Sequence, residues 1–215
     1  MTDSDSGFFI TVEGLDGSGK TTQAGLLAEA LSKDGHVVKV VRDPGTTVLG
    51  ERLRELLLEP TSGWELEGWA EASLFLAARV QLAHEVIYPA LARGEVVVSD
   101  RYLDSNLVYQ GARGVPWDGI MAMHRICQVE RLPDLTLILD LAVATARGRR
   151  ASDLPPDRLE SESSQYHERV RAGYQAVART FPARAVLLQA DQHLGDLAME
   201  CQRVARERLA ARRSD

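Results

Sequence analysis

The stretch VEGLDGSGKTTQ, residues 12–23, constrains the fold more than any other part of the chain. It satisfies the pattern G-x-x-x-x-G-K-[ST] from Gly14 to Thr21, directly after an apolar run and directly before apolar residues at helical spacing. Glycines at these positions let successive backbone N–H groups turn toward a phosphate, and the helix that follows adds the positive end of its dipole. The stretch therefore predicts a strand, a phosphate-binding loop and a helix.

Side chains of this loop have separate predicted roles. Lys20 is placed to bridge the β- and γ-phosphates of a nucleotide, and the Thr21 hydroxyl is placed to bind Mg²⁺. A GTPase would also need an N/T-K-x-D element, and neither Lys33 nor Lys39, the other two lysines, lies in one. This excludes a GTPase and leaves ATPases and small-molecule kinases as candidates. The residues expected to bind the nucleotide are Gly14, Leu15, Asp16, Gly17, Ser18, Gly19, Lys20, Thr21 and Thr22.

Short apolar runs alternate with longer helical patterns along the chain. Such runs read as strands that are covered on both faces, which is typical of a parallel sheet; they are FFITV, HVVKVV, EVVVS, LTLILDL and AVLLQA. The alternation predicts an α/β fold of three layers, with a five-stranded parallel sheet flanked by helices. We expect a single domain, 1–215, with a mobile surface loop at about 148–160, and one long helix or a pair broken near Pro89 over residues 66–93.

Charge and composition limit the classes of partner. A net charge of -6 argues against a general nucleic-acid binder, so an anionic ligand must be held by local clusters of arginine and lysine. The chain has no apolar run of membrane-spanning length and no basic, apolar leader, so we expect no membrane contact and a cytoplasmic protein. The two cysteines and five histidines have no metal-ligand spacing, which predicts satisfied or surface histidines; these are Cys127, Cys201, His36, His84, His124, His167 and His193.

Two predicted strands end in charged residues, at the edge where open parallel sheets bind their ligands. The first such end is RDPGTT, residues 42–47, and the second is SDRY, residues 99–102. Asp100 is placed to be the acidic partner of Mg²⁺ together with Thr21, and Arg101 is placed to neutralise an acceptor phosphate. An ion pair that merely caps the strand end is the alternative interpretation.

Phe75 and Arg79 are four residues apart in LFLAARVQL and thus lie on one face of a predicted helix. A ring and a guanidinium on one face can stack on a base and hydrogen-bond its edge. An aromatic residue on so apolar a helix is also a common core residue. The residues themselves leave both interpretations open.

These segments together resemble the thymidylate kinase family, whose members phosphorylate dTMP to dTDP with ATP. The resemblance runs from about residue 8 to 161, through VEGLDGSGKTT, RDPGTT with GERLRELLL, LFLAARVQL, SDRYLDSNLVYQGARG, PDLTLILDL and DRLES. It implies a P-loop NTPase fold of the nucleoside monophosphate kinase type, Mg²⁺ with ATP, and a homodimer packed through helices. The dTMP site that it implies consists of Arg42, Asp43, Phe75, Arg79, Arg101, Ser105, Asn106, Tyr109 and Gln110.

Individual roles follow from the same resemblance. It places Phe75 and Arg79 on thymine, Ser105, Asn106 and Gln110 near the base, Tyr109 on the 2′ side of the sugar, and Arg42 and Arg101 on the phosphate. Asp16 matches an acidic position near the acceptor sugar and phosphate. The family's usual E-P-G-G-T is here the shorter-armed Asp43-Pro44-Gly45-Thr46-Thr47.

Gly17 marks a difference within the family, because some members carry an arginine there that serves as the transition-state cation. Without this arginine, the chain resembles the bacterial class that takes the cation from the lid, which is here the loop at about residues 148–160. Candidates in this lid are Arg149, Arg150 and Arg158, and Arg150 is preferred. The expected catalytic set is Lys20, Asp16, Arg101, Arg150 and Arg149. Arg147 and QADQ, residues 189–192, are candidate adenine contacts.

Two other functions are weighed against this one. A deoxynucleoside kinase would need a carboxylate base for a 5′-hydroxyl, and Asp43 is the candidate, although Arg42 and Arg101 would then face no acceptor phosphate. A P-loop protein that binds nucleotides without transferring phosphate is the third possibility.

Overall fold

A parallel sheet forms the centre of the molecule, of which the computed structural model describes residues 7–59, 65–149 and 156–212. The order of the strands in the sheet is β2-β3-β1-β4-β5. Every pairing is parallel, with β1 hydrogen-bonded to β3 on one side and to β4 on the other. The five predicted strands are confirmed as β1 (Phe8–Gly14), β2 (Val38–Arg42), β3 (Val96–Asp100), β4 (Leu135–Asp140) and β5 (Ala185–Gln189).

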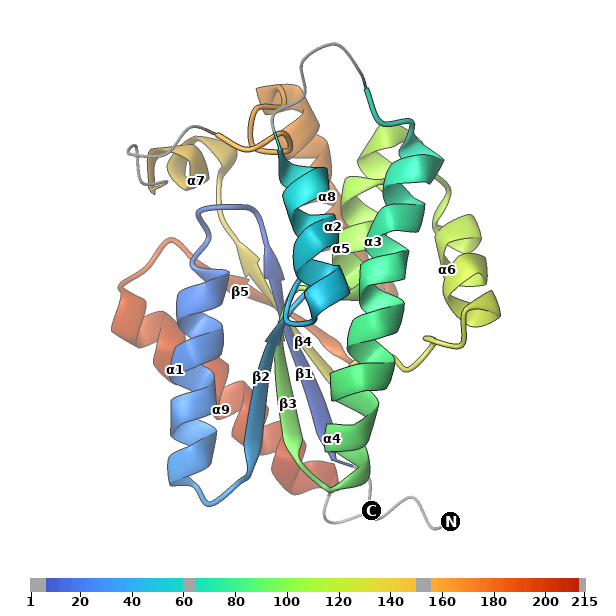
Figure 1. The fold of residues 1–215 in the computed structure, drawn as a ribbon. Coiled ribbons are helices and arrows are strands. Elements are labelled where there is room, and N and C mark those ends of the chain that lie inside the picture. Colours follow the sequence, from blue (N-terminus) through green and yellow to red (C-terminus); the bar gives the residue numbers. More distant parts are fainter. Residues whose placement is uncertain (1–6, 60–64, 150–155, 213–215) are drawn as a thin grey trace.

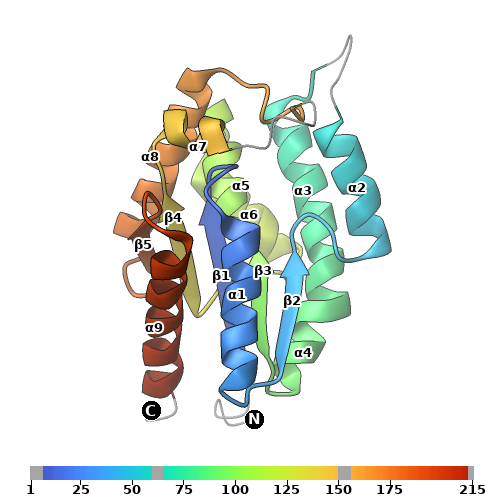
Figure 2. The ribbon, with the colours of Figure 1, turned by 90° about the vertical axis from the view of Figure 1, so that its left-hand side faces the viewer.

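Helices cover both faces of this sheet and complete the three predicted layers (Figure 1). One face carries α1 (Lys20–Lys33) and α9 (Leu194–Arg212), which pack side by side in Figure 2. The other face carries α4 (Tyr88–Ala92), α5 (Leu103–Tyr109) and α8 (Ser164–Thr180). Around them lie α2 (Val48–Leu58), α3 (Gly68–Leu82), α6 (Trp117–Ile126) and α7 (Val143–Arg149).

The alternation of side chains along β1 decides what reaches the functional end of the sheet. Phe8, Ile10 and Val12 point to one face, so Phe9 and the residues two and four positions later point to the other. The last residue of that second set is Glu13, which is fully buried near the carboxyl end of the strand. Strand β1, which is apolar along most of its length, thus places one carboxylate beneath α5 and α8.

Residues 68–92 form one continuous helical path, which decides between the two predicted alternatives. Between α3 and α4, residues Ala83–Ile87 form a π-helical turn. Pro89 follows this turn and has no N–H to donate, and its ring would crowd a regular α-helical carbonyl four residues earlier. The wider π turn accommodates the proline without breaking the helix.

The loop between β1 and α1 has the backbone expected of a phosphate-binding loop. Gly17 and Gly19 have φ angles of 85° and 92°, in the left-handed region that favours glycine. The two positions differ in their surroundings: a Cβ at Gly17 would lie 2.2 Å from the carbonyl oxygen of Ala146 on α7, whereas a Cβ at Gly19 would meet no atom within 4 Å. Helix α7 therefore fills the space that a side chain at position 17 would need.

This contrast gives a matched pair of variants. Gly17→Ala is expected to lower the free energy of unfolding more than Gly19→Ala, because both incur a left-handed backbone cost on the order of 1–3 kcal/mol but only the first collides with α7. Urea unfolding without nucleotide measures both. Equal losses would mean that α7 moves aside at no cost.

Candidate active site

A pocket, here called the main pocket, opens at the carboxyl ends of β1, β2 and β3. Nearly all the residues predicted to bind the acceptor line it, although they come from segments far apart in the sequence. The lining consists of Asp16, Asp43, Pro44, Arg54, Leu58, Phe75, Arg79, Arg101, Ser105, Asn106, Tyr109, Gln110, Asp157 and Leu159. A pocket with two aromatic rings, Phe75 and Tyr109, and several convergent polar groups is typical of a small-molecule site.

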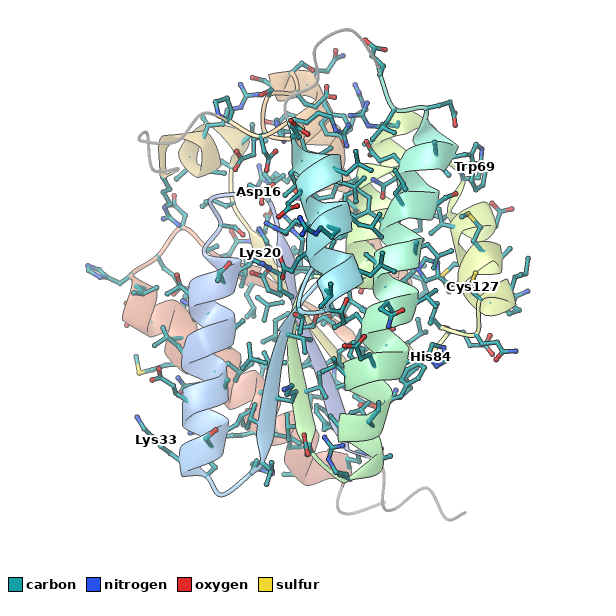
Figure 3. The ribbon with its side chains drawn as sticks, viewed as in Figure 1. Asp16, Lys20, Lys33, Trp69, His84 and Cys127 are labelled. Carbon is teal, nitrogen blue, oxygen red and sulfur yellow. The ribbon has the colours of Figure 1, made fainter. Side chains whose placement is uncertain are left out.

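Asp16 joins this pocket to the phosphate loop. Its Oδ1 accepts hydrogen bonds from Arg101 Nη2 at 2.5 Å and from Lys20 Nζ at 3.3 Å. Figure 3 shows Asp16 and Lys20 at the same end of α1, with Lys33 at the opposite end. Burial raises the pKa of Asp16, but Arg101 and Lys20 outweigh it and hold that pKa below its ordinary range. The single negative charge of Asp16 thus contacts both positive charges.

Arg101 is held in an unusual backbone conformation. Its φ of 69° lies in the left-handed region, which side-chain-bearing residues seldom adopt outside functional sites. Ser99 Oγ donates to its carbonyl oxygen at 2.6 Å, and its Nη1 donates to the hydroxyls of Ser105 at 3.1 Å and Tyr174 at 3.0 Å. The guanidinium is therefore oriented before any ligand binds.

Glu13 controls those two hydroxyls from beneath the pocket. Its Oε2 accepts from Ser105 Oγ at 2.6 Å and from Tyr174 OH at 3.0 Å, and its Oε1 accepts from the Tyr102 N–H at 2.7 Å. Since the hydroxyl protons point to Glu13, the hydroxyl lone pairs point to Arg101. Burial and the nearby charge of Asp104 raise the pKa of Glu13 to about 7.

Thr21 and Asp100 are brought together as predicted for a metal-binding pair. Thr21 Oγ1 donates to Asp100 Oδ2 at 2.5 Å, at the point where α1 begins and β3 ends. Each of these residues offers an oxygen atom as a metal ligand, which is the type that Mg²⁺ prefers, and the phosphate loop lies next to them. These residues therefore fit a Mg²⁺ ion that arrives with nucleotide phosphates.

Arg42, which is predicted to face the acceptor phosphate, does not line the main pocket, whereas Arg54, for which the sequence predicts no role, does. Arg42 Nη2 binds both carboxylate oxygens of Glu51, at 2.9 and 2.8 Å, and the structure does not bring it into the main pocket. Arg54 lines that pocket instead, and its Nη1 donates to the carbonyl of Pro44 at 3.2 Å. Burial and the positive charges of Arg42 and Arg101 lower the pKa of Arg54, and the charges of Asp100 and Glu51 oppose this effect.

Arg79 is the most thoroughly bound side chain of the pocket, with 1% of its surface exposed. Its Nε donates to Asp43 Oδ2 at 2.5 Å, its Nη2 donates to the carbonyl of Tyr102 at 3.0 Å, and its Nη1 donates to Asn106 and His124. Four of its five N–H groups thus have partners within the described residues, which leaves one Nη2 hydrogen for a ligand.

His124 is a satisfied histidine, as the sequence predicts, and Ser105, predicted near the base, lines the pocket. His124 Nε2 accepts from Arg79 at 2.9 Å, so its Nδ1 carries the proton and donates to the Ile120 carbonyl at 2.8 Å. Burial and the Arg79 charge lower the pKa of His124 to about 4, which keeps the ring neutral. Ser105 lines the pocket, but its hydroxyl binds Arg101 and Glu13.

The three candidate lid arginines have different positions. Arg149 Nη1 donates to the carbonyl of Ala190 at 2.8 Å, in a second, open pocket beside the phosphate loop that also involves residues 190–194. Arg158 forms an ion pair with Glu71 at 2.6 Å, away from the phosphate loop. Arg150 lies outside the described residues. Arg147, a candidate adenine contact, instead donates to Ser164 at 2.7 Å.

Several pocket residues were not predicted from the sequence. Arg54 lies three and four positions before the buried Leu57 and the pocket-lining Leu58, so helical spacing alone could have identified it. Asp157 and Leu159 lie within the predicted lid, at about residues 148–160, and no periodic pattern marks them. Glu13 and Glu71 are wholly buried, and their partners come from distant segments.

A phosphate loop lies at the edge of a five-stranded parallel sheet, and beside it the main pocket has cations of its own, Arg54 and Arg101. This combination defines a P-loop nucleotide kinase. The family model for thymidylate kinase matches residues 12–200. The chain belongs to the thymidylate kinase family, which makes it a phosphotransferase.

Similar proteins agree over nearly the whole chain. A thymidylate kinase of Desulforudis audaxviator is 48% identical over 88% of this chain and 86% of its own, and one of Chromobacterium violaceum is 44% identical over 89% and 90%. The crystal structure of thymidylate kinase from Ehrlichia chaffeensis superposes with a TM-score of 0.75 at 30% identity, covering 93% of this chain and 99% of that one. Among the described residues, no helix has both the length and the hydrophobicity needed to cross a membrane.

The raised pKa of Glu13 predicts a pH dependence of stability. Between pH 4.5, its ordinary pKa, and about 7, the folded chain keeps a proton that the unfolded chain has released, so raising the pH through this window lowers the free energy of unfolding. From pH 5 to 7.5 the wild type should lose on the order of 2 kcal/mol more than Glu13→Gln. Urea unfolding at both pH values measures the difference, and parallel losses would show that Glu13 titrates normally.

Proposed function

We propose that this chain transfers the γ-phosphoryl group of ATP to the 5′-phosphate of dTMP, giving dTDP for the synthesis of dTTP. The observation that carries the proposal is Asp16, which contacts Lys20 of the phosphate loop and Arg101 of the neighbouring pocket at once. Two phosphates bound at those cations would meet across this carboxylate. The two sites therefore have the adjacency that direct transfer between two nucleotides requires.

The reaction joins two anions, so the largest barrier that the protein can lower is electrostatic. Lys20 would neutralise the donor phosphates, and Arg101 and Arg54 would neutralise the acceptor. No general base is needed, since a phosphate monoester with a second pKa of about 6 is already mostly dianionic at pH 7. Preorganised cations avoid the cost of turning them toward the phosphates during the reaction.

The phosphate loop is proposed to hold ATP through residues 14–22, with the backbone N–H groups of Gly17 to Lys20 turned toward the phosphates. Ser18 supports this, because its Oγ is buried without a hydrogen-bond partner among the described residues. Thr21 and Asp100 would hold Mg²⁺. When bound, this ion supplies positive charge that offsets the negative charge of the donor phosphates.

Thymine is proposed to lie between Phe75 and the polar edge formed by Arg79, Asn106 and Gln110. The remaining Nη2 hydrogen of Arg79 suits the O4 acceptor of thymine, and an amide oxygen suits its N3–H donor. Tyr109, whose OH donates to Asp16 at 3.2 Å, would close the sugar side of the pocket.

The lid, about residues 148–160, is proposed to supply the remaining catalytic cation. Arg149 and Arg150 are the proposed residues, and Arg150 is preferred by its place in the family pattern. Arg149 also lines the second pocket, which Ala190, Asp191 and Gln192 share, and this pocket is the proposed adenine site. Arg158 is not proposed for catalysis, because its side chain is paired with Glu71.

The deoxynucleoside kinase alternative is not favoured by the surroundings of Asp43. Its Oδ2 accepts from Arg79 at 2.5 Å, so the carboxylate compensates a buried cation. Arg101 and Arg54 would also lie in the pocket without an acceptor phosphate. The geometry is that of a monophosphate site.

A cytoplasmic homodimer is proposed as the working form. The supporting observation is that two large apolar side chains are exposed, Trp69 of α3 at 41% and Ile126 of α6 at 80%. Two such residues on neighbouring helices suit a self-complementary contact with a second copy of the chain.

Incubation of the purified protein with ATP, Mg²⁺ and either dTMP or thymidine tests the proposal. We expect dTDP and ADP from dTMP, no phosphorylation of thymidine, and loss of turnover when EDTA removes Mg²⁺. Anion-exchange chromatography separates the products. Phosphorylation of thymidine alone would establish the deoxynucleoside kinase, and binding of both substrates without dTDP would establish a non-catalytic protein.

Arg54 and Arg42 provide a paired test of the acceptor site. Arg54→Gln should raise the KM for dTMP about tenfold or more, since it removes a charge-assisted contact to the phosphate. Arg42→Gln should change that KM little, because Arg42 already pairs with Glu51 outside the pocket. Steady-state kinetics with varied dTMP distinguish them, and the reverse order would return Arg42 to the acceptor phosphate.

A further inference from the structure

A chain of hydrogen bonds runs from the pocket into the protein interior along the proposed thymine edge. Arg79 Nη1 donates to Asn106 Oδ1, Asn106 Nδ2 donates to Gln110 Oε1 at 2.9 Å, and Gln110 Nε2 donates to Glu71 Oε1 at 2.7 Å. The first three residues line the pocket, whereas Glu71 is fully buried behind them. We refer to these four residues as the amide chain.

Chemistry allows the amide chain only one direction. A guanidinium only donates hydrogen bonds and a carboxylate only accepts them, so Arg79 at one end and Glu71 at the other both fix the sense of the two amides between them. Turning both amides around would place donor against donor at Arg79 and acceptor against acceptor at Glu71. The Asn106 oxygen is thereby kept beside Arg79.

This direction matches thymine and opposes cytosine. The free Nη2 hydrogen of Arg79 and the adjacent Asn106 oxygen present a donor followed by an acceptor, which complements the O4 acceptor and N3–H donor of thymine. Cytosine presents an amino donor and an N3 acceptor at the same two positions. Reading cytosine would require the amides to turn, against both ends of the amide chain.

We infer that Glu71 is a specificity-determining residue that never touches the substrate, and that it selects thymine over cytosine by fixing the direction of the amide chain. The inference rests on the proposed function for the identity of the ligand. It also accounts for the position of Glu71: its charge is balanced by Arg158 at 2.6 Å and Arg113 at 3.3 Å, so the carboxylate can face Gln110 from a fully buried position.

The test compares dTMP with the 5′-monophosphate of 5-methyldeoxycytidine, which keeps the methyl group and differs only in the hydrogen-bonding edge. Glu71→Gln replaces an acceptor-only end with an amide that can donate, while Arg79 still opposes reversal at the other end. The preference for dTMP, as the ratio of the two kcat/KM values, should therefore fall about tenfold or more, the weight of one charge-assisted hydrogen bond. The ratio of the two dissociation constants from calorimetry should fall in parallel.

Arg113→Gln is the matched control, because it cuts an ion pair to Glu71 and leaves the Gln110 bond in place. It should keep the preference of the wild type. An unchanged preference in Glu71→Gln, or an equal fall in both variants, would overturn the inference. If Glu71→Gln yields no folded protein, Glu71→Asp keeps the charge beside the arginines and withdraws the carboxylate from Gln110, and the same fall is expected.

The two readouts separate this inference from the proposed function. If the wild type forms no dTDP, the proposed function fails, and the calorimetric ratio still decides whether Glu71 sets the preference. If the wild type forms dTDP and Glu71→Gln keeps the full preference, only the role of Glu71 fails.

Discussion

The charge balance at Asp16 is the interaction on which the rest of the site depends. Lys20 begins α1 and Arg101 follows β3, yet both contact Asp16, and like charges in a partly buried site repel unless an anion lies between them. Asp16 supplies that anion. Substrate phosphates can then take over this compensation without any large movement of the cations. An acidic chain with a net charge of -6 thus forms two anion sites by local arrangement of charge.

The fold could be predicted from the sequence because it rests on local patterns. Apolar runs, helical spacing and the glycines of the phosphate loop each act over a few residues, and the confirmed parallel sheet follows from them. The pocket was predicted in part, because Phe75 and Arg79 share a helical face that points into it. Arg42 shows the limit: strand position brings it near the site, but the direction of its side chain depends on Glu51.

The other unpredicted features depend on contacts between distant segments. Gly17 is compatible with the loop motif in any case, yet only the position of α7 shows why a side chain there is excluded. Likewise Asp43 is one carbon shorter than the usual glutamate of its family, and the sequence cannot show that it still reaches Arg79. Such outcomes depend on differences of an ångström in backbone position. Periodic patterns carry no information at that scale.

Burying the carboxylates behind the pocket costs desolvation free energy, so the stability of the fold does not explain why they are there. Replacing a buried ion pair with apolar residues of similar volume is often neutral or stabilising, so Glu13 and Glu71 are not required by the fold as such. Each instead fixes the direction of groups that face the ligand: Glu13 turns two hydroxyls so that their lone pairs meet Arg101, and Glu71 turns an amide toward Asn106. Hydroxyl and amide groups can reverse their hydrogen bonds, whereas a carboxylate between fixed donors cannot. Placing a carboxylate at the end of each network, which for Glu13 requires a pH above its pKa of about 7, therefore converts adaptable side chains into a rigid recognition surface.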